Sequence, residues 1–287
     1  MALPPRAERT ILITGASSGF GRATVRHLLM NGWRVFATVR SDDDRESLRA
    51  EAEELAATSR LHVLRCDVTN ANDVRELGEA VAARTDRLGA LLNNAGTAWA
   101  APLELLHIAD LRAQFEVNTV APVAVTQAVL PLLKAAQGTI INVSSVSGRL
   151  AFPVLGPYCA SKFALEAISD AWRIELAPLG VRVVLIEPAA STTRIWDTSE
   201  GRMRDLITAH QDGPYARLFA AFTGVAQQGR TTGFSPLAFA VLVARILAAR
   251  QPQTRYTIPR GVAIQLALSR VLPDRVLDGF IRRTLNW

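Results

Sequence analysis

The chain has 287 residues, of which 49% are hydrophobic and 20% charged, so it can bury a sizeable core and lacks the composition of a disordered chain. Its net charge is +6, but the basic residues form no Lys/Arg-rich run and no aromatic residues alternate with them, which argues against a nucleic-acid partner. The two cysteines and four histidines show no disulfide or metal-ligand spacing, so we expect no metal site.

The length is within reach of one large α/β domain, and we expect a single domain over residues 1–287. The N-terminus has no apolar signal core, and no uncharged apolar run reaches the roughly 18 residues that a membrane span requires. We therefore expect a soluble, cytoplasmic protein without a membrane span.

Short β-rich segments alternate with longer segments of helical spacing along the first two-thirds of the chain. The expected strands are residues 10–14, 34–39, 61–65, 90–94, 139–144, 181–187 and, near the C-terminus, 254–258. Apolar strands separated by helices predict a parallel sheet that is covered by helices on both faces.

The segment 189–234 mixes glycines, polar residues and short amphipathic pieces without a strand pattern, and long connections of this kind are usually lids or disordered. We expect it to be a helical lid for the substrate. The apolar residues expected to line a pocket are Ile195, Trp196, Met203, Leu206, Ile207, Tyr215, Leu218, Phe219 and Phe222.

A helix is expected to begin at Ser235 and Pro236, which suit an N-cap and a first helical position. After the last strand, residues 262–287 form an amphipathic helical tail. The tail could cover the substrate pocket, pack onto the body of the protein or touch a membrane surface, and we favour packing over membrane contact.

Three glycines, Gly15, Gly19 and Gly21, follow the first strand directly and lie at the start of a helix. Glycines there permit a tight turn and let backbone N–H groups approach a pyrophosphate, which a helix N-terminus favours electrostatically. The strand before and the helix after make a dinucleotide site the better interpretation than an ordinary turn.

Tyr158 and Lys162 are four residues apart in an apolar helical segment, so their side chains lie on one face. A free phenol has a pKa near 10, and a neighbouring ammonium group favours its ionised form. The pair therefore predicts an acid/base device, although a core tyrosine beside a surface lysine would show the same spacing.

The chain also has NNAG at 93–96, Asn118 and a serine thirteen residues before Tyr158. Together with the glycine turn and the Tyr158–Lys162 pair, these motifs resemble the short-chain dehydrogenase/reductase family. The Tyr158 helix most resembles the hydroxysteroid and retinol dehydrogenase branch of that family. The resemblance covers the chain from about residue 10 to the end, weakly over 190–235. It implies a Rossmann-type doubly wound sheet of about seven strands. It also implies hydride transfer between a nicotinamide cofactor and a hydrophobic carbonyl or alcohol.

The resemblance also assigns site residues. Tyr158 would be the general acid/base, Lys162 would bind the nicotinamide ribose, Ser145 would hold the substrate oxygen, and Asn118 would anchor a water that relays protons to Lys162. The implied cofactor-binding residues are Gly15, Ser17, Ser18, Gly19, Phe20, Gly21, Arg40, Asp67, Val68, Asn94, Ala95, Gly96, Tyr158, Lys162, Pro188 and Thr193. Ala189 stands where the family usually has a glycine after Pro188, which puts the local backbone there in question.

The second strand ends at Val39 and Arg40, whereas relatives that prefer NAD have an acidic residue at about position 39. A guanidinium group is available there for a 2′-phosphate, so we expect NADP, with NAD as the alternative. A solvated arginine at a strand end is the structural alternative for Arg40.

Two other functions remain open at this point: a ketoacyl reductase of fatty-acid or polyketide type, and a cofactor-sensing protein without activity. By resemblance we expect a homodimer or homotetramer that pairs two helices across a two-fold axis. One is near residues 110–135, and the next carries the small residues Ala160, Ala164, Ala167 and Ala171. The alternative is that these alanines pack against the chain's own sheet.

Overall fold

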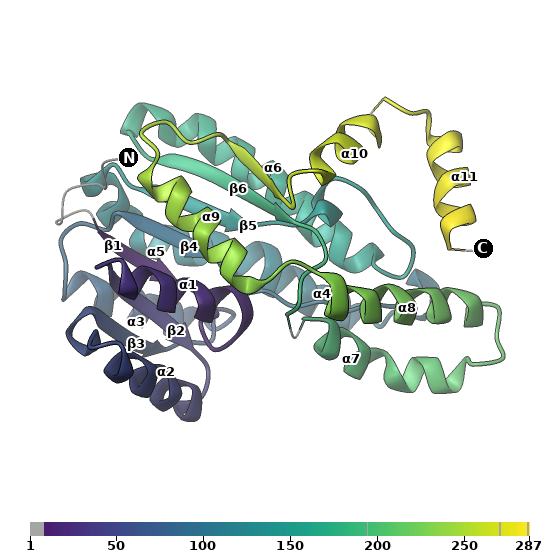
Figure 1. Ribbon diagram of the computed structural model, residues 1–287, viewed down its shortest axis with the longest axis horizontal. Helices are drawn as coiled ribbons and strands as arrows, with labels where there is room; N and C mark the ends of the chain where they lie inside the picture. Colours follow the sequence, from purple (N-terminus) through teal and green to yellow (C-terminus); the bar gives the residue numbers. More distant parts are fainter. Residues whose placement is uncertain (1–8, 194, 270, 286) are drawn as a thin grey trace.

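The computed structural model of the chain describes residues 9–193, 195–269, 271–285 and 287, without the side chains of residues 195–200 and 202. Seven strands form one parallel sheet in the order β3-β2-β1-β4-β5-β6-β7 (Figure 1). The predicted parallel sheet is confirmed, and its strands begin and end within one residue of the predicted ranges. They are β1 (Thr10–Ile13), β2 (Arg34–Val39), β3 (Leu61–Arg65), β4 (Ala90–Asn93), β5 (Thr139–Val143), β6 (Arg182–Pro188) and β7 (Arg255–Ile258).

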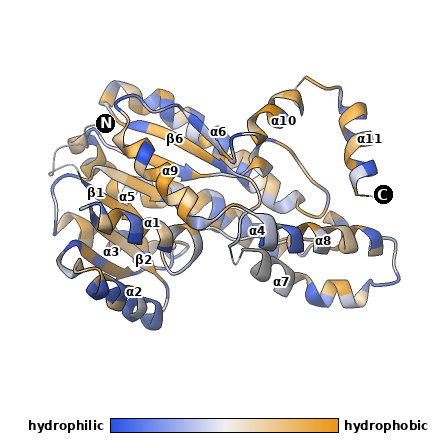
Figure 2. Ribbon diagram, in the orientation of Figure 1, coloured by the Kyte–Doolittle hydropathy of each residue, from blue (hydrophilic) through white to orange (hydrophobic). Residues whose placement is uncertain are grey.

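Helices cover both faces of the sheet, as in a doubly wound fold. One face is covered by α1 (Gly19–Met30), α2 (Asp42–Glu54) and α9 (Pro236–Ala248), and the other by α3 (Ala71–Ala82), α5 (Ala121–Ala136) and α6 (Gly156–Leu176). Each face has its own apolar cluster, because successive strand residues point to opposite sides. Figure 2 shows the strands and α9 as mainly hydrophobic and α2 as mainly hydrophilic.

Short helical turns connect these elements at both edges of the sheet, and the two that come directly before β3 and β6 lie at the amino edge. They are η2 (Thr58–Arg60), η3 (Leu103–Leu105), the π-helical turn η4 (Glu116–Val120), η5 (Val146–Gly148) and η6 (Ala177–Leu179), and α4 (Ile108–Phe115) precedes η4. The continuous helical stretch Ile108–Ala136 is long and apolar enough to cross a membrane by length and composition alone. Its α5 part buries Val125, Val129 and Leu133 against the sheet, as a core helix does.

The segment 189–234 forms two helices, α7 (Ile195–Ala209) and α8 (Ala216–Thr232), and an isolated β-bridge between Ser191 and Phe234 joins its two ends. Its apolar side chains form a third cluster with Ala100 and Val154. Met203, Leu218, Phe219 and Phe222 are buried there, while Leu206, Ile207 and Tyr215 pack against them. The predicted side chains of Ile195 and Trp196 lie outside the described residues.

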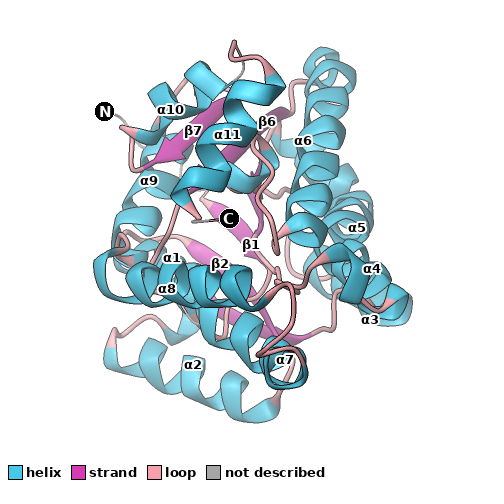
Figure 3. Ribbon diagram, turned by 90° about the vertical axis from the view of Figure 1, so that its right-hand side faces the viewer, coloured by secondary structure: helices cyan, strands magenta, loops and turns pink. Residues whose placement is uncertain are grey.

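The tail forms α10 (Val262–Ser269) and α11 (Asp274–Thr284), which project from the body in Figure 1. Among its described residues α11 has no fully buried side chain, although Leu277 and Ile281 are half-buried. The chain returns after α11, where Leu285 packs against the third cluster and Trp287 stacks on Tyr215 with ring centroids 6.2 Å apart. The tail is therefore an arch that runs from β7 to the start of α8, and in Figure 3 α11 lies between α10 and α8.

Candidate active site

The glycine turn follows β1 and is held by side chains from the neighbouring strands. The Gly15 N–H donates to Thr38 Oγ1 (3.2 Å), and Asn94 Nδ2 donates to the carbonyl oxygens of Thr14 (2.9 Å) and Gly15 (3.0 Å). A Cβ at Gly21 would collide with the carbonyl oxygen of Gly15, and Gly15 itself has φ +66°, which favours glycine. Gly15 and Gly21 are thus required by the turn itself, and Asn94 is the clamp that holds it.

A cavity of about 560 Å³ extends from this turn along the carboxyl edge of the sheet. Its position between β1 and β4 is the place where the strand order reverses, the usual ligand crevice of a doubly wound fold. Every site residue predicted from the sequence lines the cavity except Gly21 and Asn118.

The residues present at the turn fit a dinucleotide. The α1 helix begins at Gly19 with no acidic side chain in its first turn, and the Ser18 hydroxyl makes no capping hydrogen bond. Its N-terminal N–H groups therefore face the cavity without a competing negative charge, which suits a pyrophosphate. Among the described residues, no cluster of three His, Cys, Asp or Glu side chains could hold a metal ion.

Three of the four predicted catalytic side chains meet at the other end of the cavity. The Ser145 side chain, two residues after β5, lies close enough to Tyr158 on α6 to affect the pKa of the phenol. Lys162 Nζ donates to the carbonyl oxygen of Val143 (2.8 Å) and lies 5.8 Å from the centre of the Tyr158 ring. A phenol, a hydroxyl and a buried amine therefore face one space.

Burial dominates the ionisation of both Tyr158 and Lys162. Desolvation raises the pKa of Tyr158 to about 12, although this residue lines the cavity and is only partly buried, and the Ser145 hydrogen bond opposes the rise. Desolvation also lowers the pKa of Lys162 to about 8, against the attraction of Glu166. Burial thus raises the pKa of Tyr158, opposite to the lowering expected from Lys162, whose Nζ donates to the Val143 carbonyl oxygen.

Asn118 lies in η4, fully buried behind the cavity wall. Its Nδ2 donates to the Thr97 carbonyl oxygen (2.9 Å) and to Ser161 Oγ (3.1 Å), and its Oδ1 accepts from the Thr97 N–H (2.9 Å). The side chain therefore ties the loop after β4 to helix α6. Asn118 and Lys162 approach each other across Gly96, which has no side chain. A Cβ added at Gly96 would lie 3.4 Å from Asn118 Oδ1 and 3.8 Å from Lys162 Nζ.

Ala189, which stands where the family usually has a glycine, has an ordinary backbone conformation. Ala189 has no positive φ, and its N–H donates to the carbonyl oxygen of Ile258 at the end of β7 (2.9 Å). The conformational freedom of a glycine is therefore not needed at this position.

Sequence reasoning missed the side chains that line the cavity beyond Tyr158. They come from the loop after β4, from η4 and from the segments around η5 and after β6, and they are Ala98, Trp99, Val117, Val146, Leu155 and Ala190. The one available signal was that they lie within three residues of motif residues in the sequence, which is weak because spacing does not encode loop conformation.

Comparison with known proteins identifies the family of the chain. The family model described as short chain dehydrogenase matches residues 9–203. The chain is 34% identical to an NADPH-dependent 3-dehydrocapnine reductase of Ornithobacterium rhinotracheale (97% of this chain, 98% of the relative) and 33% identical to retinol dehydrogenase 5 of Mus musculus (96% and 89%). A solved short-chain dehydrogenase from Streptomyces avermitilis superimposes with a TM-score of 0.76 at 28% identity, covering 94% of both chains.

The chain belongs to the short-chain dehydrogenase/reductase family and is an oxidoreductase with the Rossmann-type fold of that family. The predicted family and fold are confirmed, and the relatives include a member of the retinol dehydrogenase branch.

Proposed function

We propose that the protein transfers a hydride between NADP(H) and a hydrophobic carbonyl or alcohol, with Tyr158 as the general acid/base. The observation that best supports this proposal is that one cavity is lined by the glycine turn and by Tyr158, Ser145 and Lys162. A nicotinamide cofactor, bound along this cavity, would supply the hydride. A cofactor-sensing protein would not need the three polar side chains to converge, so we favour an enzyme.

The proton chemistry follows from the positions of these side chains. Ser145 Oγ would hold the substrate oxygen, and Tyr158 Oη would give its proton to that oxygen during carbonyl reduction. A pKa of about 12 keeps the phenol protonated at neutral pH, in the form that donates. Lys162 would bind the nicotinamide ribose, while Asn118 would act by fixing the loop at Thr97.

The preference for NADP rests on the end of β2. Val39 is buried and neutral, while Arg40 is exposed and lines the cavity. The pKa of the Asp67 carboxyl is lowered mainly by a hydrogen bond from the Thr69 backbone. The charge of Arg40 also lowers it, so the guanidinium lies near this carboxyl. The acidic residues that follow belong to α2, where Ser41 caps the Asp44 N–H. NAD remains the alternative cofactor.

The proposed substrate class rests on the apolar cavity-lining residues named above, such as Trp99, Val146 and Leu155. The lid side chains that were expected to line the pocket pack into the third cluster instead. The tail arch adds exposed apolar side chains, with Val276 and Phe280 54% and 68% exposed. Retinol dehydrogenase 5, a relative, is named for an apolar alcohol. We therefore propose a hydrophobic substrate, with residues 189–234 as the lid of a single catalytic domain; a ketoacyl reductase is the alternative.

A panel of carbonyls of increasing apolar area tests this function. With NADPH we expect kcat/KM to rise with the apolar area of the substrate, because a larger side chain removes more apolar wall from water. Truncation before Leu272, which removes α11, should lower kcat/KM for large substrates more than for small ones. A preference for small polar carbonyls, or for acyl thioesters, would exclude the proposed substrate class.

We also propose that α6 pairs with a second copy of the chain. Ala160, Ala167 and Ala171 are exposed and Ala164 is half-buried, so these alanines do not pack against the chain's own sheet. Ile174 on the same helix is 69% exposed. Small residues permit close helix packing, and the exposed apolar neighbour would be covered by the partner.

Light scattering at micromolar concentration tests this pairing. The native chain should have the mass of a dimer or tetramer, and Ala167→Arg should shift the mass toward the monomer because a long charged side chain cannot enter a close helix contact. Ala50→Arg, at an exposed alanine on α2, is the matched control and should leave the mass unchanged. A monomeric native chain would exclude the assembly.

A further inference from the structure

Helix α6 carries a ladder of polar side chains at a spacing of four residues: Tyr158, Lys162, Glu166 and Asp170. This spacing places the four on one helix face. Tyr158 and Lys162 line the cavity, whereas Glu166 does not. Lys162 is 5% exposed and Glu166 6%, so an amine and a carboxyl lie one turn apart in the protein interior.

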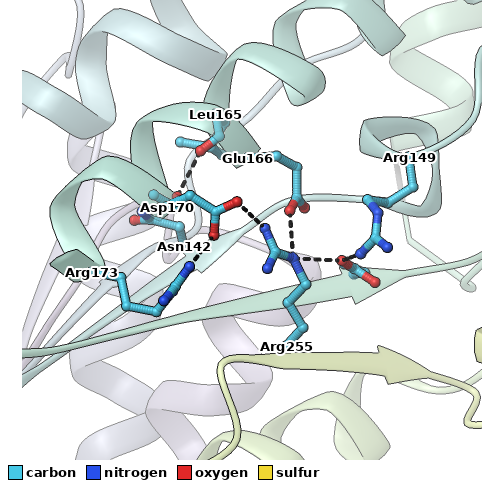
Figure 4. A network of polar contacts seen from close by, with 9 residues as sticks. Asn142, Arg149, Leu165, Glu166, Asp170, Arg173 and Arg255 are labelled. Carbon is cyan, nitrogen blue, oxygen red and sulfur yellow. Dashed lines mark hydrogen bonds and ion pairs between the residues drawn. The ribbon is translucent and has the colours of Figure 1, made fainter.

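Glu166 is held from behind by an arginine of the last strand. Its Oε2 accepts from Arg255 Nε (3.0 Å), and the same guanidinium donates to Asp170 Oδ2 (2.7 Å) and lies 3.4 Å from Glu187 Oε1 (Figure 4). Arg149, after η5, donates to Glu187 Oε1 (2.6 Å). The network therefore joins α6, β6, β7 and the segment after η5.

A buried carboxylate is costly unless cations compensate for it. Burial is the main cause that raises the pKa of Glu166, and the negative charge of Glu187 raises it too, while Ser144 and Arg255 lower it. Such a network could serve the stability of the fold alone, without any effect on Tyr158 or Lys162. One consequence is specific to Glu166: it is the charge that raises the pKa of Lys162 against desolvation.

The elements packed against α6 bring other charged groups to this region. Glu187 comes from β6, Arg149 from the segment after η5 and Arg255 from β7, while Glu116 of η4 is exposed at the cavity. Glu166 differs from these groups because it is buried on the same helix face as Lys162, one turn away. The coupling is therefore local to one turn of α6.

We propose that Glu166 is a positioning residue that serves as the buried counter-charge of Lys162, oriented by Arg255, and that it keeps the catalytic amine charged in the neutral pH range. The proposal rests on the proposed role of Lys162. It also gives the last strand a part in the active site, because Arg255 on β7 determines where the Glu166 carboxylate lies.

The chain allows a direct test, since Lys134 and Lys162 are its only lysines. In protein labelled with [13C]lysine, two sets of side-chain signals report the two ionisations by NMR without substrate or cofactor. Lys134 is exposed and serves as an internal reference, and Lys162 should titrate near 8. In Glu166→Gln, the midpoint of Lys162 should move to lower pH by about one pH unit, as expected for losing one opposite charge.

Asp170→Asn is the matched control, because it removes a carboxylate from the same guanidinium but lies two turns from Lys162. Its Lys162 midpoint should stay at the native value, and Glu166→Asp, which restores the charge, should return the midpoint toward it. Equal shifts in Glu166→Gln and Asp170→Asn, or no shift in either, would overturn the proposal. If Glu166→Gln unfolds, the titration is repeated in concentrated sucrose, which favours the compact state.

The pH dependence of turnover separates this proposal from the proposed function. If Lys162 must be charged, activity falls as pH rises through its pKa, and this alkaline limb should move to lower pH in Glu166→Gln with the NMR midpoint. A shifted midpoint with an unchanged activity profile would keep Glu166 as the counter-charge and reject the catalytic role of Lys162. An unshifted midpoint rejects the counter-charge whatever the activity.

Discussion

Tyr158→Phe should lower the rate of carbonyl reduction by about 10²–10⁴-fold, the contribution that a positioned proton donor usually makes. The phenylalanine ring keeps the packing of Tyr158 against the cavity wall but has no proton to give, so NADPH should bind nearly as in the native protein. The measurement is the single-turnover rate of NADPH oxidation, together with an NADPH fluorescence titration.

Tyr256→Phe is the matched control for this change. The Tyr256 hydroxyl, on β7, accepts a hydrogen bond from the Gln253 N–H (2.9 Å) and does not line the cavity. Loss of that hydroxyl should leave the single-turnover rate within about twofold of the native rate, because an exposed neutral hydrogen bond contributes only modestly. Near-native turnover in Tyr158→Phe would show that another group donates the proton.

The fold was predictable because its signals are local in the sequence. Each strand is a short apolar run between turns, and a strand buried on both faces needs no partner to be recognised. The Gly15–Gly21 turn and the Tyr158–Lys162 pair are likewise set by residues close together in the chain. For these, backbone geometry alone brings the groups together.

Contacts between distant segments were not predictable. Asn118 bonds to Thr97 and Ser161, 21 and 43 residues away, and these bonds place it behind the cavity wall. The sign of the Tyr158 pKa shift was also missed, because desolvation depends on everything that packs around the phenol. Arg255 gave no signal, since its partners come from α6 and β6.

The lid shows the limit of amphipathic patterns. The spacing of apolar residues in 189–234 correctly indicated side chains that avoid water, but the pattern does not say what covers them. Two helices from one segment can bury their apolar faces against each other, and α7 and α8 do so around Met203 and Phe219. Those side chains are therefore unavailable to line the pocket.

Arg40→Ala should weaken NADPH binding by about 10- to 100-fold, the loss expected for one charge-assisted hydrogen bond to a phosphate. NADH lacks the 2′-phosphate, so its affinity should change little. Because Arg40 is exposed and lines the cavity, the substitution should not disturb the fold. The measurement is a titration of both reduced cofactors at one fixed ionic strength, since salt screens such contacts.

Arg49→Ala provides the control for net charge, since Arg49 is an exposed arginine on α2 that does not line the cavity. It changes the charge of the protein by the same amount and should weaken NADPH binding little. Equal weakening for NADPH and NADH in Arg40→Ala would show that Arg40 supports the cavity wall and does not read the 2′-phosphate. A loss confined to NADPH and absent from Arg49→Ala would instead mean that the end of β2 selects the cofactor through one guanidinium, with Val39 contributing by offering no acidic group to the ribose.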